Sequence, residues 1–125
     1  ADYRISQPIE QKRKRTESTL SLELVPNPDI LAEMGKLKSP KQITVGFAAE
    51  TEDLIKNAKE KLKKKNLDII VVNKVGGEKC AFGSDFAYAL IITPESEESA
   101  PEYIPKKELV RKLFNKIEEL LSKKQ

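Results

Sequence analysis

The pattern of hydrophobic and polar residues changes period along the chain and predicts four strands. Leucines alternate with polar residues from position 20 to position 24, which is typical of a half-buried strand, here over 19–25. A β-branched apolar run predicts a second strand over 42–49. Residues 67–72 are almost continuously apolar, as expected of a strand with helices on both faces, and 87–93 form a fourth candidate.

Three segments with helical spacing lie between and after these strands. The start Asn27-Pro28-Asp29 is typical of a capped helix, here over 28–38, with apolar residues at Ile30, Leu31, Met34 and Leu37. Thr51 is expected to cap a second helix, which ends in the lysine cluster of 61–65. Residues 106–124 predict a strongly amphipathic helix at the end of the sequence.

This alternation predicts an α/β fold, a three-layer Rossmann-like parallel or mixed sheet with a protruding flap strand. Two apolar strands separated by one helix imply a right-handed parallel crossover. Ligands of such sheets gather at the carboxyl ends of the strands, which selects 47–51 and the loop after Val72. A length of 125 residues supports one domain or part of a larger one.

Composition excludes several classes of function. One Cys and no His exclude an internal disulfide, a Cys/His zinc cluster and imidazole catalysis, and we assign Cys80 no nucleophilic role. The formal net charge of +3 is too balanced to indicate a nucleic-acid partner. No apolar run is long enough for a membrane span. We therefore expect a reducing, cytoplasmic location without a membrane or nucleic-acid partner.

Four groups of residues have both a structural and a functional interpretation. The basic run at 12–15 is a solvated charge run, a flap that closes over a polyphosphate, or a nuclear-localisation or nucleic-acid contact. The segment 27–30 is either a capped helix start or an anion site. Phe47 belongs either to the core or to a pocket for a base. Lys61 and Lys65 either complement a helix dipole or reach one phosphate chain together.

The order and spacing of seven motifs resemble those of a known family, the phosphopantothenate-cysteine ligase domain. This domain is commonly fused to a flavin-dependent phosphopantothenoylcysteine decarboxylase. The motifs are Ala1-Asp2-Tyr3-Arg4, a flap with Lys12 and Lys14, Asn27-Pro28-Asp29-Ile30-Leu31, Val45-Gly46-Phe47-Ala48-Ala49-Glu50-Thr51, Lys65-Asn66-Leu67-Asp68, Asn73, and Phe82-Gly83-Ser84-Asp85.

The resemblance implies a role in coenzyme A biosynthesis. The carboxylate of 4'-phosphopantothenate attacks the α-phosphate of CTP and releases pyrophosphate, and L-cysteine then displaces CMP from the acyl-cytidylate to form an amide. The resemblance also implies Mg²⁺ with the triphosphate, a homodimer, and FMN only in a fused decarboxylase half. The alternative is a non-catalytic nucleotide-binding or dimerisation module with a basic flap.

Residue roles follow from the same resemblance. Lys12 corresponds to the flap lysine needed for catalysis, and Asp2 to a residue that contacts the cytidine nucleotide. Phe47 corresponds to a residue of the nucleotide pocket. The helix start and the triphosphate lysines correspond to Pro28, Asp29, Ile30, Leu31, Lys61 and Lys65. Metal ligands are not identified by the resemblance.

Two features limit what the chain is expected to do alone. The family's glycine-rich nucleotide loop and an essential asparagine precede the position of Ala1. We therefore expect the C-terminal portion of one ligase domain, inactive by itself, with a flap at about 5–25 and a mobile acidic loop at about 94–105. The segment 86–88 departs from the family, which usually carries an asparagine there.

Overall fold

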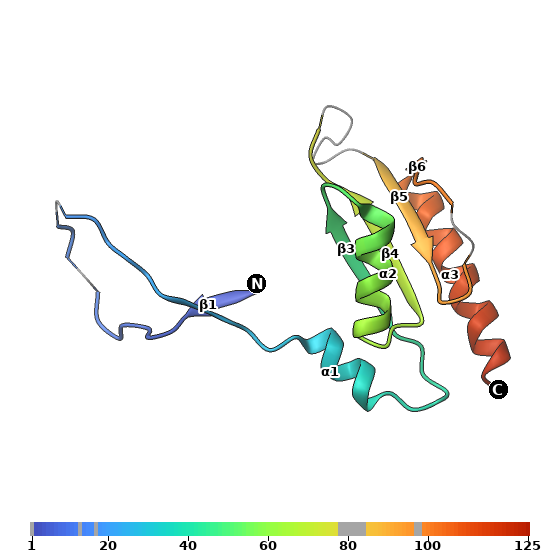
Figure 1. The fold of residues 1–125 in the computed structure, drawn as a ribbon, viewed down its shortest axis with the longest axis horizontal. Helices are drawn as coiled ribbons and strands as arrows, with labels where there is room; N and C mark the ends of the chain where they lie inside the picture. The colour runs from blue at the N-terminus through green and yellow to red at the C-terminus, as the bar shows by residue number, and fades with distance from the viewer. Residues whose placement is uncertain (1, 13, 17, 78–84, 97–98) are drawn as a thin grey trace. The chain divides into compact units, whose positions relative to one another are not determined.

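The computed structural model describes residues 2–12, 14–16, 18–77, 85–96 and 99–125 (Figure 1). The chain divides into two compact units, Ala1–Ile30 and Leu31–Gln125.

The first unit is a two-stranded ribbon. β1 (Tyr3–Ile5) pairs antiparallel with β2 (Leu24–Pro26), and backbone bonds from Ser6 to Glu23 and from Asn27 to Asp2 extend the pairing. The predicted strand over 19–25 is therefore wrong for 19–23. Its leucines are largely exposed, because a ribbon without a third layer offers them no core to pack against.

The second unit contains a four-stranded mixed sheet. Its strands lie in the order β3-β4-β5-β6, with β3 parallel to β4 and the other neighbours antiparallel. The elements are α1 (Ile30–Leu37), which starts at the last residue of the first unit, β3 (Val45–Glu50), α2 (Leu54–Lys64), β4 (Ile69–Lys74), β5 (Phe86–Ile92), β6 (Glu102–Pro105) and α3 (Lys106–Lys123). The predicted parallel pairing of the two apolar strands around one helix is confirmed.

Helices α2 and α3 cover opposite faces of this sheet (Figure 1). Ala58 and Leu62 of α2 pack with Ile70, Val72 and Ile92 on one face. On the other face, Leu113 of α3 packs with Ile69 and Val71. All apolar residues of β4 are thus buried, as its continuous apolar sequence predicts, and the three-layer α/β fold is confirmed.

Three local predictions need correction. Helix α2 begins at Leu54, and its N-cap is Asp53 in a left-handed conformation rather than Thr51. Of the apolar positions predicted for α1, Leu31 packs against the core, whereas Met34 and Leu37 are exposed.

The acidic segment 94–105 ends in a strand, β6, although we predicted a mobile connection throughout. Ile104 of β6 pairs with Ala87 of β5 and is buried. Phe86, in the segment that departs from the family pattern, stacks on Tyr103 with ring centroids 5.0 Å apart. The order of this segment therefore comes from pairing with β5, which local composition does not reveal.

Candidate functional site

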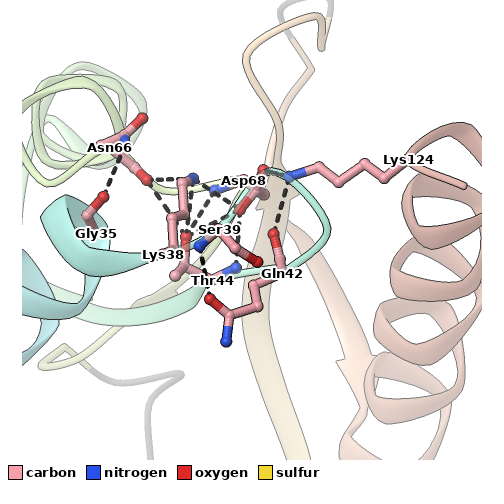
Figure 2. Close-up of polar contacts among 8 residues, drawn as sticks. All are labelled: Gly35, Lys38, Ser39, Gln42, Thr44, Asn66, Asp68 and Lys124. Atoms are coloured by element: carbon pink, nitrogen blue, oxygen red, sulfur yellow. Dashed lines mark hydrogen bonds and ion pairs between the residues drawn. The ribbon is translucent and has the colours of Figure 1, made fainter.

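A cluster of polar side chains around Asp68 joins the amino ends of β3 and β4 (Figure 2). One carboxylate oxygen accepts hydrogen bonds from Lys38 Nζ at 2.9 Å, from the Thr44 amide at 2.8 Å and from the Thr44 hydroxyl at 2.9 Å. The other oxygen accepts a bond from Lys124 Nζ at 2.7 Å, and Lys124 also donates to the Gln42 carbonyl. The cluster connects the segment before β3, the start of β4 and the residue after α3.

These contacts hold the pKa of the Asp68 carboxyl well below its usual range. Burial acts in the opposite direction and by itself would raise that pKa. The hydrogen bonds from Lys124, Thr44 and Lys38 together outweigh burial. Because the cluster lies at the amino ends of the strands, opposite the edge where ligands gather, we interpret it as a stabilising joint.

A second contact next to this cluster brings α1 against the end of α2. A Cβ atom on Gly35 would lie 1.9 Å from the Lys65 carbonyl oxygen, so the two backbones meet where no side chain fits. Asn66 adopts a φ of 52° and donates from Nδ2 to the Gly35 carbonyl at 2.8 Å. Leu67 is buried in the core. The motif over 65–68 therefore has a structural explanation in the folding of this joint.

The carboxyl end of β3 holds a different polar group, formed by Glu50, Asn57 and Lys61. Glu50 is the last residue of β3, and Asn57 and Lys61 lie four residues apart on α2, so they share one face of the helix. Lys61 Nζ donates to Glu50 Oε1 at 2.5 Å, and Asn57 Nδ2 donates to Glu50 Oε2 at 3.2 Å. The Glu50 side chain is 12% exposed and that of Lys61 is 43% exposed. The predicted triphosphate lysine is therefore held by a carboxylate.

The opposite face of the sheet carries an exposed aromatic ring, Phe47, three residues before Glu50 on β3. Val45 packs on the α3 face, and strand alternation places Phe47 on that face too. Phe47 is 72% exposed, which rules out the interpretation of this residue as core. A ring with this exposure can serve as a stacking surface for a planar group.

Asn73 lies diagonally next to Phe47 on the α3 face. It follows the buried part of β4 and is paired in register with Ala49 of β3, whose side chain is small. The Oδ1 atom of Asn73 is buried and finds no hydrogen-bond partner in the part of the chain that the structure describes. Buried acceptors are nearly always satisfied, so this atom is a candidate contact for an ordered water or, after a side-chain rotation, for a ligand.

Sequence reasoning gave Asn73 no role and missed both Glu50 and Asn57. A signal for Asn73 was present, because an amide that follows a continuously apolar strand comes at the carboxyl end of a buried strand. No comparable signal marks Glu50 or Asn57. Their contact depends on how α2 lies against β3, which only the fold determines.

The predicted site residues divide between the two units. Leu31, Phe47, Lys61 and Lys65 belong to the second unit, where Lys65 is the C-cap of α2. The first unit holds the others, which are Asp2, Lys12, Pro28, Asp29 and Ile30. Asp2 accepts a backbone bond from Asn27, and Lys12 is exposed. The convergence of the two groups stays a prediction.

Some predicted features lie outside the described residues. They are Ala1, Arg13, Cys80 and the segment 82–84 of the last motif. Among the residues that are described, no three acidic or cysteine side chains gather to hold a metal ion. No helix in those same ranges is both long and apolar enough to cross a bilayer.

Comparison with known proteins gives consistent results. The chain is 48% identical over 77 residues to the coenzyme A biosynthesis bifunctional protein CoaBC of Haemophilus influenzae, covering 62% of this chain and 19% of that protein. It is 38% identical over 117 residues to a cysteine/cysteine sulfinic acid decarboxylase of unknown prokaryotic origin, covering 94% of this chain and 33% of that protein. The chain thus spans about a fifth to a third of the length of these relatives.

A solved structure supports the same relationship. The crystal structure of the C-terminal domain of a coenzyme A biosynthesis bifunctional protein CoaBC is similar with a TM-score of 0.64 and 30% identity, over 82% of this chain and 46% of that one. The sequence pattern of the DNA/pantothenate metabolism flavoprotein C-terminal domain matches residues 1–121. The chain therefore belongs to the DNA/pantothenate metabolism flavoprotein C-terminal domain family.

Proposed function

We propose that this chain forms part of the nucleotide site of a phosphopantothenate-cysteine ligase that acts in coenzyme A biosynthesis. The observation that carries the proposal is the exposed ring of Phe47 on β3, diagonal in register to Asn73 on β4, whose buried Oδ1 has no partner among the described residues. The relatives named CoaBC support the pathway. The family resemblance supplies the reaction.

In this reaction the 4'-phosphopantothenate carboxylate attacks the α-phosphate of CTP. The bond from the α-phosphorus to the bridging oxygen breaks, pyrophosphate leaves, and an acyl-cytidylate forms. The amine of L-cysteine then attacks the acyl carbon, CMP leaves, and an amide results. Such chemistry depends on positioning and on cations that offset the charge of the leaving groups, which agrees with a chain that contains no histidine.

The base is expected to stack on Phe47, and the Asn73 side chain is expected to rotate on binding so that Oδ1 accepts a hydrogen bond from the exocyclic amine. Cytosine and adenine carry such an amine, whereas uracil presents a carbonyl oxygen at the equivalent position. Asn73 therefore favours CTP and ATP over UTP. By the family resemblance, Lys61 and Lys65 take the phosphates and Lys12 is the flap lysine. We expect Mg²⁺ to arrive with the triphosphate.

Calorimetric titration of the chain with CTP, UTP and a short oligonucleotide tests the nucleotide site. We expect saturable CTP binding that is weakened about tenfold by Phe47→Ala, the scale of one base–aromatic stack, and weaker UTP binding. Steeply salt-dependent oligonucleotide binding without CTP binding would contradict the proposal and support a nucleic-acid partner.

Turnover tests the flap assignment in the full-length ligase. Because Lys12 is exposed, Lys12→Gln has little packing to lose and should leave the melting temperature unchanged. We expect turnover to fall by about a hundredfold, which is the scale of losing one charge-stabilising group. Equal losses of stability and activity would count against a catalytic role.

We also propose that the chain forms a homodimer through its first unit. The support is a set of exposed apolar side chains on the ribbon and its arm, a kind of surface that marks contact with another protein. They are Ile5, Ile9, Leu20, Leu22 and Leu24. Analytical ultracentrifugation should find a dimer that Leu20→Ser with Leu22→Ser dissociates. A wild-type monomer at all concentrations would exclude this assembly.

A further inference from the structure

We propose that Glu50, held by Asn57, is a positioning residue that fixes the Lys61 ammonium for the outer phosphates of a nucleoside triphosphate. This inference rests on the proposed nucleotide site. Glu50 belongs to one of the sequence motifs, but neither the motifs nor the comparisons give a role to Glu50 or to Asn57. The proposed role follows from how Glu50, Asn57 and Lys61 are arranged.

The first part of the argument is the layering of the group. Glu50 lies inside, with 12% of its side chain exposed, and Lys61 lies outside it, with 43% exposed. The Glu50 carboxylate therefore holds the Lys61 ammonium from the protein side. The other side of the Lys61 side chain is accessible to solvent. An ammonium has three N–H donors, so a bond to Glu50 is compatible with further bonds to phosphate oxygens.

The second part is the anchoring of Glu50 itself. Its Oε2 atom accepts a bond from Asn57 Nδ2, while Oε1 accepts the bond from Lys61. Its backbone is fixed as well, since its carbonyl accepts a bond from the Val75 amide at 2.9 Å and its residue pairs in register with Lys74. Because both the backbone and the carboxylate group of Glu50 are held, Glu50 can define the position of a flexible lysine side chain.

The third part is the cost that such anchoring removes. Lysine has a long side chain with several rotatable bonds, and immobilising it on binding weakens affinity by about two- to tenfold. A lysine already held at the carboxyl end of a parallel strand loses less freedom when the phosphate arrives. Glu50 thus contributes to triphosphate binding although it carries the same sign of charge as the ligand.

Charge-conserving substitutions separate this role from a change in electrostatics. Glu50→Asp keeps the negative charge but shortens the side chain by one methylene, and Asn57→Ala releases Glu50 without any change in charge. The readout is the ratio of CTP affinity to CMP affinity, measured by NMR titration of the full chain. A change in the base pocket alone would shift both affinities and leave their ratio constant.

We expect Glu50→Asp and Asn57→Ala each to lower the CTP to CMP ratio by about two- to tenfold. Lys61→Met should lower it further, and in the Lys61→Met background Glu50→Asp should have no additional effect. Lys64→Met, which removes an exposed cation from the same helix, serves as the matched control and should change the ratio little. Melting temperatures verify that each variant folds.

Two results would overturn the inference. One is an unchanged ratio in both Glu50→Asp and Asn57→Ala. The other is an equal fall of the ratio with and without Lys61, which would indicate a structural role independent of that lysine. If wild-type protein binds no CTP, the proposed function fails as well. If CTP binds and Lys61→Met leaves the CTP to CMP ratio unchanged, Lys61 does not contact the outer phosphates. The inference about Glu50 is then wrong, but the proposed nucleotide site is not contradicted.

Discussion

The two ends of the parallel strands β3 and β4 differ in how their polar groups are satisfied. At the amino ends, Asp68 accepts bonds from two lysines and from Thr44, and is largely buried among them. At the carboxyl ends, the Phe47 ring is exposed and a buried oxygen of Asn73 finds no partner among the described residues. The same strands thus have an end whose polar groups are satisfied and an end that we propose binds a ligand. Substitutions at the two ends should separate stability from binding.

The largest expected effect is on the stability of the amino-end joint, through Gly35→Ala. Helix propensity alone would make this change stabilising by about 1 kcal/mol. We expect the opposite, a loss of about 3 kcal/mol in the free energy of unfolding, because the new methyl group meets the Lys65 carbonyl and the backbone has to shift. Urea denaturation measures the difference.

Gly46→Ala is the matched control for this prediction. A Cβ there would meet the ends of the Leu67 and Leu31 side chains at 2.7 and 2.9 Å, and flexible side chains can move aside more easily than a backbone carbonyl. A Gly35→Ala protein as stable as wild type would show that α1 does not contact α2 as described.

The next largest effect concerns Asp68→Asn, which removes the anion that two lysines share. We expect a loss of about 2 kcal/mol at neutral pH, since a partly buried carboxylate loses its hydrogen bonds to charged groups. The pKa of Asp68 is lower in the folded state than in the unfolded state, where it is about 3.9. Its contribution is therefore fully present above pH 4 to 5 and disappears as the pH falls below that range.

Denaturation at several pH values tests this sign. The difference between wild type and Asp68→Asn should be constant near neutrality and should shrink from about pH 4 downward. Glu33→Gln, in an exposed i,i+3 pair with Lys36, is a control with little expected effect. A difference that grows as the pH falls would contradict the ion-pair account.

At the carboxyl end, Asn73→Leu should have a smaller effect on stability and the opposite sign. Replacing a buried oxygen that has no partner with an apolar group of similar size should be neutral or stabilising by about 1 kcal/mol. CTP binding should weaken at the same time, whereas Asp68→Asn should leave CTP affinity unchanged. A marked loss of stability in Asn73→Leu would show that its amide serves the fold.

The smallest expected effect is at the Phe86–Tyr103 stack, near the same end of the sheet. Both rings are partly exposed, so their interaction should contribute about 0.5 to 1 kcal/mol. A double-mutant cycle with Phe86→Ala and Tyr103→Ala isolates this energy. A coupling energy of zero would show that the Phe86–Tyr103 stack does not help to hold β6 in place.

The sequence was sufficient for features that depend on local pattern. Ile69 to Val72 are apolar without interruption and are buried on both faces, and the amphipathic segment after Pro105 forms α3. The place of Phe47 at the tip of its strand is not confirmed, because β3 continues for three residues beyond it to Glu50.

Features that depend on distant contacts could not be predicted. The donors to Asp68 come from residues 24, 30 and 56 positions away. The β6 strand contains Glu102 and Pro105, which are unfavourable in strands, and is ordered by pairing with β5. The leucines of 20–24 show the opposite error, because an alternating pattern predicts burial that the ribbon by itself does not provide.

The central claim is that the carboxyl end of β3 and β4 binds the nucleotide and that the amino end does not. A ¹⁵N and side-chain NMR map of the chain titrated with CTP tests it most directly. We expect the largest shifts at Phe47, Asn73 and Lys61, and negligible shifts at Asp68 and Thr44. Shifts concentrated around Asp68, or no saturable shifts at Phe47 and Asn73, would contradict the account.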